Sequence, residues 1–465
     1  MKRFWLCIVL SVSGCAVGPD YKRPDAPVSA TFKELEGWSA ARPQDEAPRG
    51  QWWSVFADRE LDALLQRIDV SNQNVRAAEA RLRQARALAD QARAGLFPSL
   101  AGNASANRSK SPSLSNAPSF ATGAVNTFNA SLGASWELDL WGKVRRSIEA
   151  GDASWQASTA DLEAAKLSAR AALAQAYFSL RAADSTRKLL EDTVAAYQKS
   201  LQLTENRYKA GVVPRLDVVQ AEVQLKSTQA QLMDIGVERA QFEHAIALLV
   251  GEPPANFALP PAPLSLAMPS MPVGLPSTLL ERRPDIAAAE RSVAAANARI
   301  GVAKAAMFPS LTLSGTTGFR SGSLADLFSA PSRLWSLGAA AALPIFDAGL
   351  RRSQTDQAMA VYDEEVATYR QTVLAAFQEV EDNLAALRIL EQEAALQDEV
   401  VTAARRAVEL TTNQYQAGVV SYLNVITAQA TLLANERTAA GILSRRLTAS
   451  VALVRALGGG WRVPE

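Results

Sequence analysis

One stretch of this sequence occurs twice, and this repeat constrains the fold more than any other feature. Residues 208–225, YKAGVVPRLDVVQAEVQL, return 207 positions later as residues 415–432, YQAGVVSYLNVITAQATL, with nine of the eighteen positions identical. In each copy a glycine ends a long stretch that is poor in helix breakers, and glycine readily adopts the left-handed conformation of a helix C-terminus. The sequence therefore predicts an internal duplication in which each half contains a tight hairpin between two long helices.

The turns of both hairpins are apolar where polar residues are usual. Val212 follows Gly211, and Val419 follows Gly418. Two explanations remain open: one valine of each pair packs against the preceding helical turn, or a partner protein docks on the tip. We favour a mixture of the two, with docking preferred over packing alone.

The N-terminus is typical of a secreted bacterial lipoprotein. A basic pair and a short apolar run, residues 2–12, have the pattern of a signal peptide. The run ends in Val12-Ser13-Gly14-Cys15, which resembles a lipobox. That resemblance implies cleavage after residue 14 and acylation of the Cys15 thiol. Ala16 stands where an aspartate commonly signals retention in the inner membrane.

Composition excludes several kinds of site. Without residues 1–14 the chain carries 46 basic and 47 acidic residues, so no excess of positive charge points to nucleic acid. Cys15 is then the only cysteine and His244 the only histidine, which leaves no disulfide and no usual zinc site. Runs of carboxylates such as 363–365 are typical of solvated helix faces. We expect no metal, no cofactor and no enzymatic activity.

Four segments alternate between apolar and polar residues. Strands are predicted at about 99–108 and 127–140 in the first half, and at about 310–320 and 333–343 in the second. The alternation in the second of these is longer than in a typical globular strand and fits the two-faced strand of a membrane barrel, which has about 10 residues.

The repeat and the strands divide the chain into ordered parts. We expect these boundaries: signal peptide 1–14; extended lipidated arm 15–57; first repeat 58–250; proline-rich crossover 251–280; second repeat 281–458; C-terminal tail 459–465. Each repeat begins with a helix, the first of which runs from Asp58 to Gly95. The strands are followed by long helices at 142–210 and 349–417, and each long helix ends in a tip, at 211–213 and 418–420. Return helices then cover 214–250 and 421–457. Pro214 is expected as the first residue of one return helix and Ser421 as the N-cap of the other.

Four two-faced strands cannot enclose a pore alone, because every backbone group in a bilayer needs a hydrogen-bond partner. Two copies of the chain give a barrel of eight strands, and side chains fill the interior of such a barrel. Three copies give twelve strands and a wider lumen. A lipid-anchored tube without a catalytic group is best explained as a conduit.

The sequence resembles the TolC-type outer membrane factors, in their lipoprotein (NodT/OprM-like) branch. The motifs that carry the resemblance span nearly all of the mature chain: CAVGPDYKRP at 15–24, FPSL at 97–100 and 308–311, WELDLWG at 136–142, LERRPDI at 280–286, and both tips.

The resemblance implies a mainly α-helical homotrimer in the outer membrane of a Gram-negative bacterium. Its twelve-stranded β-barrel, with four strands per chain, continues into a periplasmic α-barrel of long antiparallel helices. Such a duct exports small molecules or drugs as the exit channel of a tripartite efflux pump, together with a periplasmic adaptor (membrane fusion) protein and an inner-membrane pump, often of the resistance-nodulation-division (RND) type.

The resemblance also implies site residues. Gly211, Val212, Gly418 and Val419 would meet the adaptor. A periplasmic gate that opens when the helices splay apart would contain Asp217, Gln220, Leu423 and Thr427.

Two of the gate residues have further interpretations. Branch members often carry a carboxylate ring at the position that aligns with Thr427, so its uncharged side chain argues against a strongly cation-selective gate. Leu423 either forms an apolar constriction or packs between helices. Asp217 equally fits a helix-terminus residue.

Two other functions remain open at this stage. The duct of a type I protein secretion system would show nearly the same sequence features. A coiled-coil structural lipoprotein explains the long helices but not the alternating strands with Trp136 and Trp335, and it predicts no ion conductance.

Overall fold

The computed structural model describes residues 16–26, 32–34, 40–41, 52–110, 124–264, 273–274 and 283–459. The expected signal peptide 1–14, Cys15 and residues 460–465 of the expected tail lie outside these ranges. The chain divides into two compact units: unit 1 contains Met1–Asp25, Arg81–Ser158 and Ala288–Tyr369, and unit 2 contains Ala26–Ala80, Thr159–Ala287 and Arg370–Glu465.

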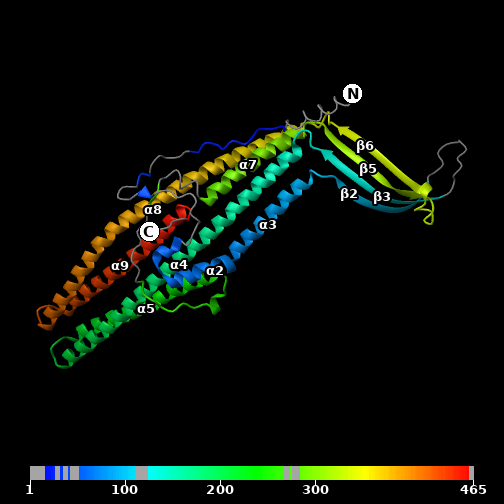
Figure 1. Ribbon diagram of the computed structural model, residues 1–465. Helices are drawn as coiled ribbons and strands as arrows, with labels where there is room; N and C mark the ends of the chain where they lie inside the picture. The colour runs from blue at the N-terminus through cyan, green and yellow to red at the C-terminus, as the bar shows by residue number, and fades with distance from the viewer. Residues whose placement is uncertain are drawn as a thin grey trace. The chain divides into compact units, whose positions relative to one another are not determined.

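The described residues are mainly helical (Figure 1). The helices are α2 (Arg59–Ser71), α3 (Gln73–Ala94), α4 (Lys143–Lys209), α5 (Arg215–Leu249), α7 (Pro284–Ala305), α8 (Leu350–Gln416) and α9 (Tyr422–Ala456), with short 3-10 turns at Trp52–Phe56, Pro254–Asn256 and Ala330–Ser332. In the part of the chain that the structure describes, no helix is apolar over a length that would cross a membrane.

Unit 1 contains a four-stranded antiparallel sheet in the order β2-β3-β5-β6, whose strands lie side by side in Figure 1. They span Ser99–Ser109 (β2), Val125–Leu138 (β3), Ser310–Ser321 (β5) and Arg333–Ala342 (β6). The prediction of a mainly helical chain with four strands is confirmed. β3 starts and ends two residues before the expected range. It ends early because Asp139 turns to cap α4 and accepts hydrogen bonds from the amides of Val144 and Arg145 at 3.0 and 2.9 Å.

The sheet has two unlike faces, set by its register. Leu132 pairs with Gly102 and with Thr317, and Thr317 pairs with Trp335. Since paired residues share a face, one face carries exposed apolar side chains: Leu100, Leu132, Trp136, Trp335 and Leu337. We call it the apolar face. The opposite face, here the polar face, carries Asn103, Ser105, Asn129, Ser131, Ser314 and Thr316.

Both edges of this sheet are open. β2 pairs only with β3, and β6 only with β5, among the described strands. Because each neighbouring pair is antiparallel, β2 and β6 run in opposite directions. A second copy of the sheet can therefore continue the antiparallel pattern at either edge.

An extended arm, residues 16–26, packs on the helices of unit 1. Gly18, at φ +109°, lies so close to Gly301 of α7 that a β-carbon on Gly18 would approach the Gly301 Cα to 2.5 Å. The side chain of Arg146 on α4 is 7% exposed, and its Nη2 donates to Asp20 Oδ1 at 2.7 Å. Residues far apart in the sequence thus hold the arm in place.

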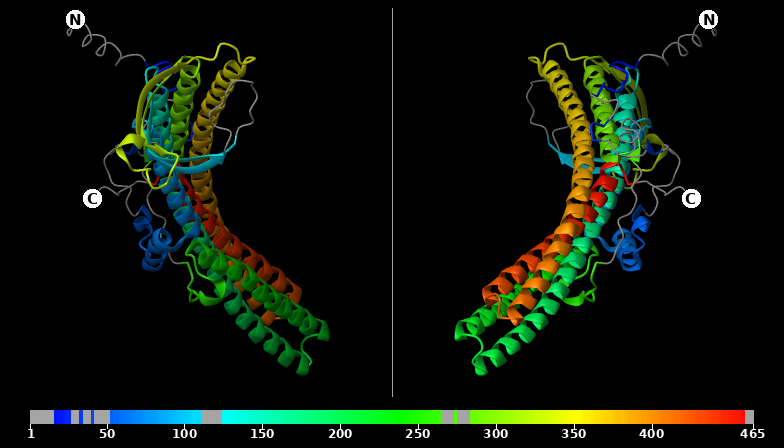
Figure 2. Two further views of the ribbon diagram at one scale, coloured as in Figure 1. Left: turned by 90° about the vertical axis from the view of Figure 1, so that its right-hand side faces the viewer. Right: turned by 90° about the vertical axis from the view of Figure 1, so that its left-hand side faces the viewer.

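The core of unit 2 is built from apolar side chains of long helices. One cluster joins α4, α5 and α9 through Ala183, Leu190, Ile235 and Leu433. The three views in Figures 1 and 2 show α5 beside α9, in agreement with their contacts. Another cluster packs Phe32 of the N-terminal segment against α8 and α9, on Val380, Leu384, Leu387, Leu453, Ala456 and Leu457.

The N-terminal segment and the crossover also meet in unit 2. Ala40–Ala41 (β1) pairs in parallel with Val273–Gly274 (β4), between the parts expected as arm 15–57 and crossover 251–280.

The expectation of one helix from Asp58 to Gly95 is wrong. The helix breaks at Asn72, which is 2% exposed and separates α2 from α3. Asn72 Oδ1 accepts from the amides of Asn74 and Val75, both at 3.0 Å, and its Nδ2 donates to the carbonyl oxygen of Leu249 at 2.7 Å. The side chain thus caps the start of α3 and the end of α5 together, which stabilises a break that helical periodicity does not reveal.

Candidate functional site

Both predicted hairpin tips are present and share one backbone geometry. Gly211 has φ +73° and Gly418 has φ +77°. The amide of Val212 donates to the carbonyl of Arg207, and that of Val419 to the carbonyl of Gln414, both at 2.9 Å. This pattern closes the end of a helix when glycine takes the left-handed conformation. No atom lies within 4 Å of the position of a β-carbon at either glycine, so both turns are open to a partner.

The valines of each tip divide into one exposed and one packed residue. Val212 is 62% exposed and Val419 is 72% exposed. Val213 and Val420 pack instead on a buried cluster beneath the tips, formed by Ala221, Tyr415, Tyr422 and Val425. Each tip therefore presents one apolar side chain to the surroundings and uses the other to hold the turn.

The residues that open the return helices differ slightly from expectation. Pro214 precedes α5 as its N-cap, with ψ 156°, so Arg215 and not Pro214 is the first residue with helical geometry. Ser421 is the N-cap of α9, but its side chain makes no capping hydrogen bond.

Polar contacts connect the two tips at their base. The guanidinium of Arg207 lies 4.7 Å from the ring centroid of Tyr415, and its Nη1 donates to the Tyr415 carbonyl at 3.2 Å. The hydroxyl of Tyr415 donates to Asp217 Oδ2 at 3.5 Å. The hydroxyl of Tyr422 lies 2.9 Å from Ser200 Oγ. We call these five residues the tip cluster; it links α4 and α5 of the first repeat to α8 and α9 of the second.

The two tyrosines of the tip cluster stay protonated at neutral pH. Burial, the largest cause, raises the pKa of Tyr415 and of Tyr422 above the usual value near 10. The negative charge of Asp217 acts in the same direction on both. Both hydroxyls therefore remain able to donate hydrogen bonds under physiological conditions.

The four residues expected at a gate lie in different environments. Asp217 is 8% exposed and faces the tip cluster, in the first turn of α5. Gln220 is half-buried. Leu423 is 54% exposed. Thr427, one turn further along α9, is exposed, and its hydroxyl donates to the Leu423 carbonyl at 2.9 Å. Leu423 and Thr427 are thus available to face a lumen, whereas Asp217 serves the interior of this chain.

Sequence reasoning missed Arg207, Tyr415 and Tyr422 as members of this cluster. A signal was present for most of the cluster, because all of its members except Tyr415, which matches Tyr208, occupy positions at which the two copies of the repeat differ. The pairs, first copy before second, are Arg207 and Gln414, Arg215 and Tyr422, and Asp217 and Asn424.

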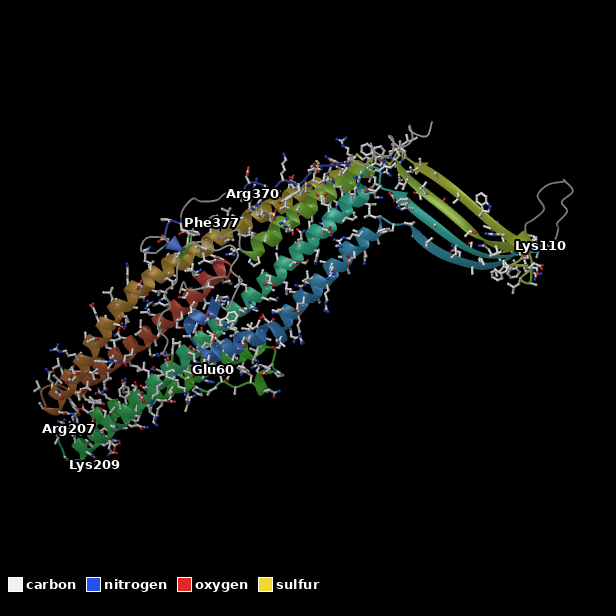
Figure 3. The ribbon with its side chains drawn as sticks, in the orientation of Figure 1. Glu60, Lys110, Arg207, Lys209, Arg370 and Phe377 are labelled. Carbon is white, nitrogen blue, oxygen red and sulfur yellow. The ribbon has the colours of Figure 1, made fainter. Side chains whose placement is uncertain are left out.

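The two tips also differ in charge. Arg207 and Lys209 lie in the last turn of α4, at the hairpin end labelled in Figure 3. The last turn of α8 carries no basic residue, since Gln414 and Gln416 occupy the equivalent positions. The tips are therefore alike in backbone and distinct in electrostatics.

The start of the arm is fixed beside the sheet. The amide of Val17 donates to the carbonyl of Trp141 at 3.0 Å. A β-carbon on Gly142, at φ +81°, would lie 2.9 Å from Ala16. Cys15 lies outside the described residues, but its neighbour Ala16 is placed where β3 passes into α4.

The part of the chain described by the structure contains no group of three or more His, Cys, Asp or Glu side chains that could hold a metal ion. The features that stand out are the two tips, the cluster beneath them and the two-faced sheet. These features can bind partners and line a passage.

Comparison with known proteins agrees with this architecture. The family model described as "Outer membrane efflux protein" matches residues 64–252 and 275–459. The probable efflux pump outer membrane protein TtgC of Pseudomonas putida is 34% identical over 453 residues, which cover 97% of this chain and 93% of that protein. The cation efflux system protein CusC of Escherichia coli is 31% identical over 460 residues, 98% of each chain.

A solved structure shows the same fold. The outer-membrane channel OprN matches with a TM-score of 0.89 and 34% sequence identity, over 96% of this chain and 100% of that one. Because the family model covers most of the chain and the relatives span it almost fully, this protein belongs to the outer membrane efflux protein family, and it is an efflux channel of the Gram-negative outer membrane that extends into the periplasm.

Proposed function

We propose that the chain forms, as a homotrimer, the exit duct of a tripartite efflux pump that exports small molecules or drugs. The observation that carries this proposal is the four-stranded sheet of unit 1, which has one apolar face, one polar face and two open edges. An open edge within lipid leaves backbone groups without partners. Identical copies remove all edges when they close into a ring.

The direction of the edge strands supports such a ring. β2 and β6 run oppositely, so β2 of one copy can pair in antiparallel fashion with β6 of the next. A barrel of eight strands is filled by its own side chains, whereas one of twelve encloses a wider lumen. Three copies are therefore the smallest number of these sheets that provides a passage for a molecule the size of a drug.

Charges on the two outer helices of unit 1 fit the same ring. Arg83 on α3 is exposed, and so are Asp363 and Glu364 on α8. None of the three has an ion-pair partner in the described ranges. The end of α3 and the start of α8 both lie next to the sheet. Arg83 is eleven residues before the end of α3, which is roughly 16 Å along the helix, and Asp363 is thirteen residues after the start of α8, which is roughly 20 Å. When β2 meets β6 of the next copy, these opposite charges come to similar heights.

We infer that the two tips dock a periplasmic adaptor protein, which connects the duct to an inner-membrane pump of the RND type. The exposed Val212 and Val419 and the shared turn geometry suit a partner that offers the same helical contact to both tips. In this proposal Leu423 and Thr427 face the axis of the trimer and narrow the resting duct, and Gln220 joins them from α5. Asp217 restrains the helices through Tyr415.

The lipid anchor is proposed at Cys15. Its neighbours Ala16 and Val17 are held at the junction of β3 and α4. That junction is the end of the sheet from which the helices of unit 1 depart, and an acyl chain there can enter the inner leaflet beside the sheet. In cells fed labelled palmitate, the wild-type chain should incorporate label and Cys15→Ser should not; label retained by the variant would contradict this assignment.

The experiment that tests the duct uses the purified full-length protein. We expect a mass three times that of the protomer and stepwise ion conductance in a planar lipid bilayer. In a strain that lacks the channel gene but keeps its adaptor and pump genes, the wild-type gene should restore drug tolerance. A monomer, or a trimer without conductance, would contradict the proposal.

A further inference from the structure

Unpaired cations gather at the end of the sheet farthest from the helices of unit 1. Arg108 is the next-to-last residue of β2, Lys110 follows that strand, and Arg333 is the first residue of β6. All three are exposed, and none has an ion-pair partner in the described part of the chain. Figure 3 labels Lys110 at this loop end of the sheet.

These cations belong to the apolar face. Arg108 and Leu100 are an even number of residues apart on β2, and Arg333 and Trp335 are so on β6, so each pair lies on one face. Lys110 continues the alternation two residues beyond Arg108. The charged ends of these side chains therefore stand at the rim of a surface that is otherwise apolar.

Aromatic rings mark the border between the apolar face and this rim. Arg333 pairs with Phe319, whose ring centroid lies 5.4 Å from that of Phe328 in the loop that joins β5 and β6. Trp335, 74% exposed, is the next residue of β6 on the same face. Aromatic side chains of this kind sit at the depth of lipid head groups in membrane sheets. Arg333 is level with Phe319 and one step beyond Trp335. Arg108 pairs with Asn126, one step beyond Phe128 on the same face, and Lys110 follows further out. All three charges therefore stand at or just beyond the level of the aromatic rings.

The surrounding sequence does little to neutralise this charge. Residues 99–136, which include β2, the loop and all but the last two residues of β3, contain no Asp or Glu, and Glu137 of β3 lies at the opposite end of the sheet, paired with Lys143. Between residues 310 and 346 the only acidic residue is Asp326. A surface with excess positive charge at head-group level favours an anionic lipid.

We propose that Arg108, Lys110 and Arg333 bind the phosphate groups of lipid A, the phosphorylated glycolipid of the outer leaflet. The helices extend into the periplasm, so the loop end of the sheet faces outward, where this lipid resides. Arginine binds phosphate with two parallel hydrogen bonds and lysine binds it as a point charge. In the ring proposed above, on which this step rests, the β2 and β6 edges that carry the three cations form one seam.

The sheet supplies its own control. Arg320 lies near the same end of β5 and is exposed, but it pairs with Asn129 and therefore belongs to the polar face. Neutralising Arg320 removes the same charge at a similar height without touching the lipid-facing side.

The test measures binding of purified full-length channel in detergent to lipid A that carries both phosphates, and to the same lipid after enzymatic removal of both. We expect the wild type to prefer the phosphorylated lipid by about 10- to 100-fold. The triple variant Arg108→Gln/Lys110→Gln/Arg333→Gln should lose this preference, and Arg320→Gln should keep it. Conductance in a bilayer shows in parallel that each variant assembles.

Three results would overturn the proposal: an unchanged preference in the triple variant, an equal loss in Arg320→Gln, or equally tight binding of phosphatidylglycerol. If the triple variant fails to assemble, the single variant Lys110→Gln, whose site lies outside the strand, is used in its place. We expect it to reduce the preference for the phosphorylated lipid severalfold, and an unchanged preference would overturn the proposal. Absence of conductance in the wild type would instead refute the proposed duct. Failure of the lipid A proposal can therefore be distinguished from failure of the proposed function.

Discussion

Arg181 on α4 and Arg388 on α8 hold equivalent positions in the two repeats, 207 residues apart, and each binds a glutamate from the N-terminal part of the chain. Arg181 pairs with Glu60, which Figure 3 labels at the start of α2, and Arg388 pairs with Glu34. Two different segments, the helix α2 and the turn at residues 33–34, thus dock on the two long helices through arginines at equivalent positions. The two repeats therefore share the position of the arginine, although the segments that it binds are not equivalent parts of the repeats.

The two arginines should differ in their contribution to stability. The side chain of Arg181 is 4% exposed and also pairs with Asp184, whose side chain is 1% exposed, whereas that of Arg388 is 36% exposed. Arg181→Ala removes one of the two cations that balance this buried carboxylate and should cost about 3–5 kcal/mol. Arg388→Ala should cost about 1 kcal/mol or less. Thermal unfolding at one scan rate compares them, and an equal loss would refute the distinction.

Bulk at the second tip should block export without preventing assembly. Gly418→Trp places a large side chain where the turn is open, so it should abolish drug tolerance while trimers remain in the membrane. Gly418→Ala introduces the same backbone strain at φ +77° with little bulk, at a cost of about 1 kcal/mol, and it should retain most export. Drug susceptibility and trimer content are measured together. Full tolerance in the Trp variant would argue against adaptor docking at this tip.

Reversal of charge should weaken the proposed contact between copies, and a second reversal should restore it. Arg83→Glu alone places a third negative charge opposite Asp363 and Glu364 of the neighbouring copy. Glu364→Arg alone places a second positive charge opposite Arg83. Each should lower the temperature at which trimers dissociate. The double variant Arg83→Glu/Glu364→Arg should recover much of the loss, which a local folding defect would not do. Additive losses in the double variant would count against this seam.

The tip cluster should weaken in alkaline solution. Burial raises the pKa of Tyr422 in the folded chain above its usual value near 10, so the unfolded chain releases the proton at lower pH than the folded chain does. The tyrosine therefore favours folding below pH 10, and this contribution declines as pH rises from about 10 toward the raised value.

Tyr422→Phe tests this effect by removing the ionisable group. The variant should be less stable than the wild type at pH 8, by about 1 kcal/mol for the lost hydrogen bond to Ser200. The difference in melting temperature should narrow between pH 10 and pH 11. Tyr208→Phe, at a position of the same hairpin that is 44% exposed, serves as the control for loss of a tyrosine hydroxyl outside the tip cluster. A constant difference for Tyr422→Phe would show that its ionisation does not matter.

Periodic features of this chain could be read from the sequence. The alternation around Leu132 and Trp136 locates β3 because the strand carries apolar side chains on one face and small or polar ones on the other. The tips could be located because Gly211 and Gly418 fulfil a local backbone requirement. Both signals arise within a few neighbouring residues, so no knowledge of distant contacts is needed.

Features that depend on distant partners could not be read in this way. The break at Asn72 is stabilised by the carbonyl of Leu249, and the burial of Asp217 by Tyr415, 198 residues away. The pairings of Arg181 and Arg388 likewise require that the N-terminal segments be placed first. Differences between the repeated copies were the sequence signal that pointed to Arg207, Asp217 and Tyr422 of the tip cluster, but not to Tyr415, which matches Tyr208.

The close approach of Gly18 to Gly301 constrains the order of maturation. Residues 16–25 leave the ribosome and cross the inner membrane before Arg146 and Gly301, the residues that they contact, have been synthesised. This N-terminal segment therefore cannot pack on the rest of the protein until α4 and α7 have come together. A chaperone that binds this chain during its passage through the periplasm therefore encounters the N-terminal segment before it has packed on α4 and α7.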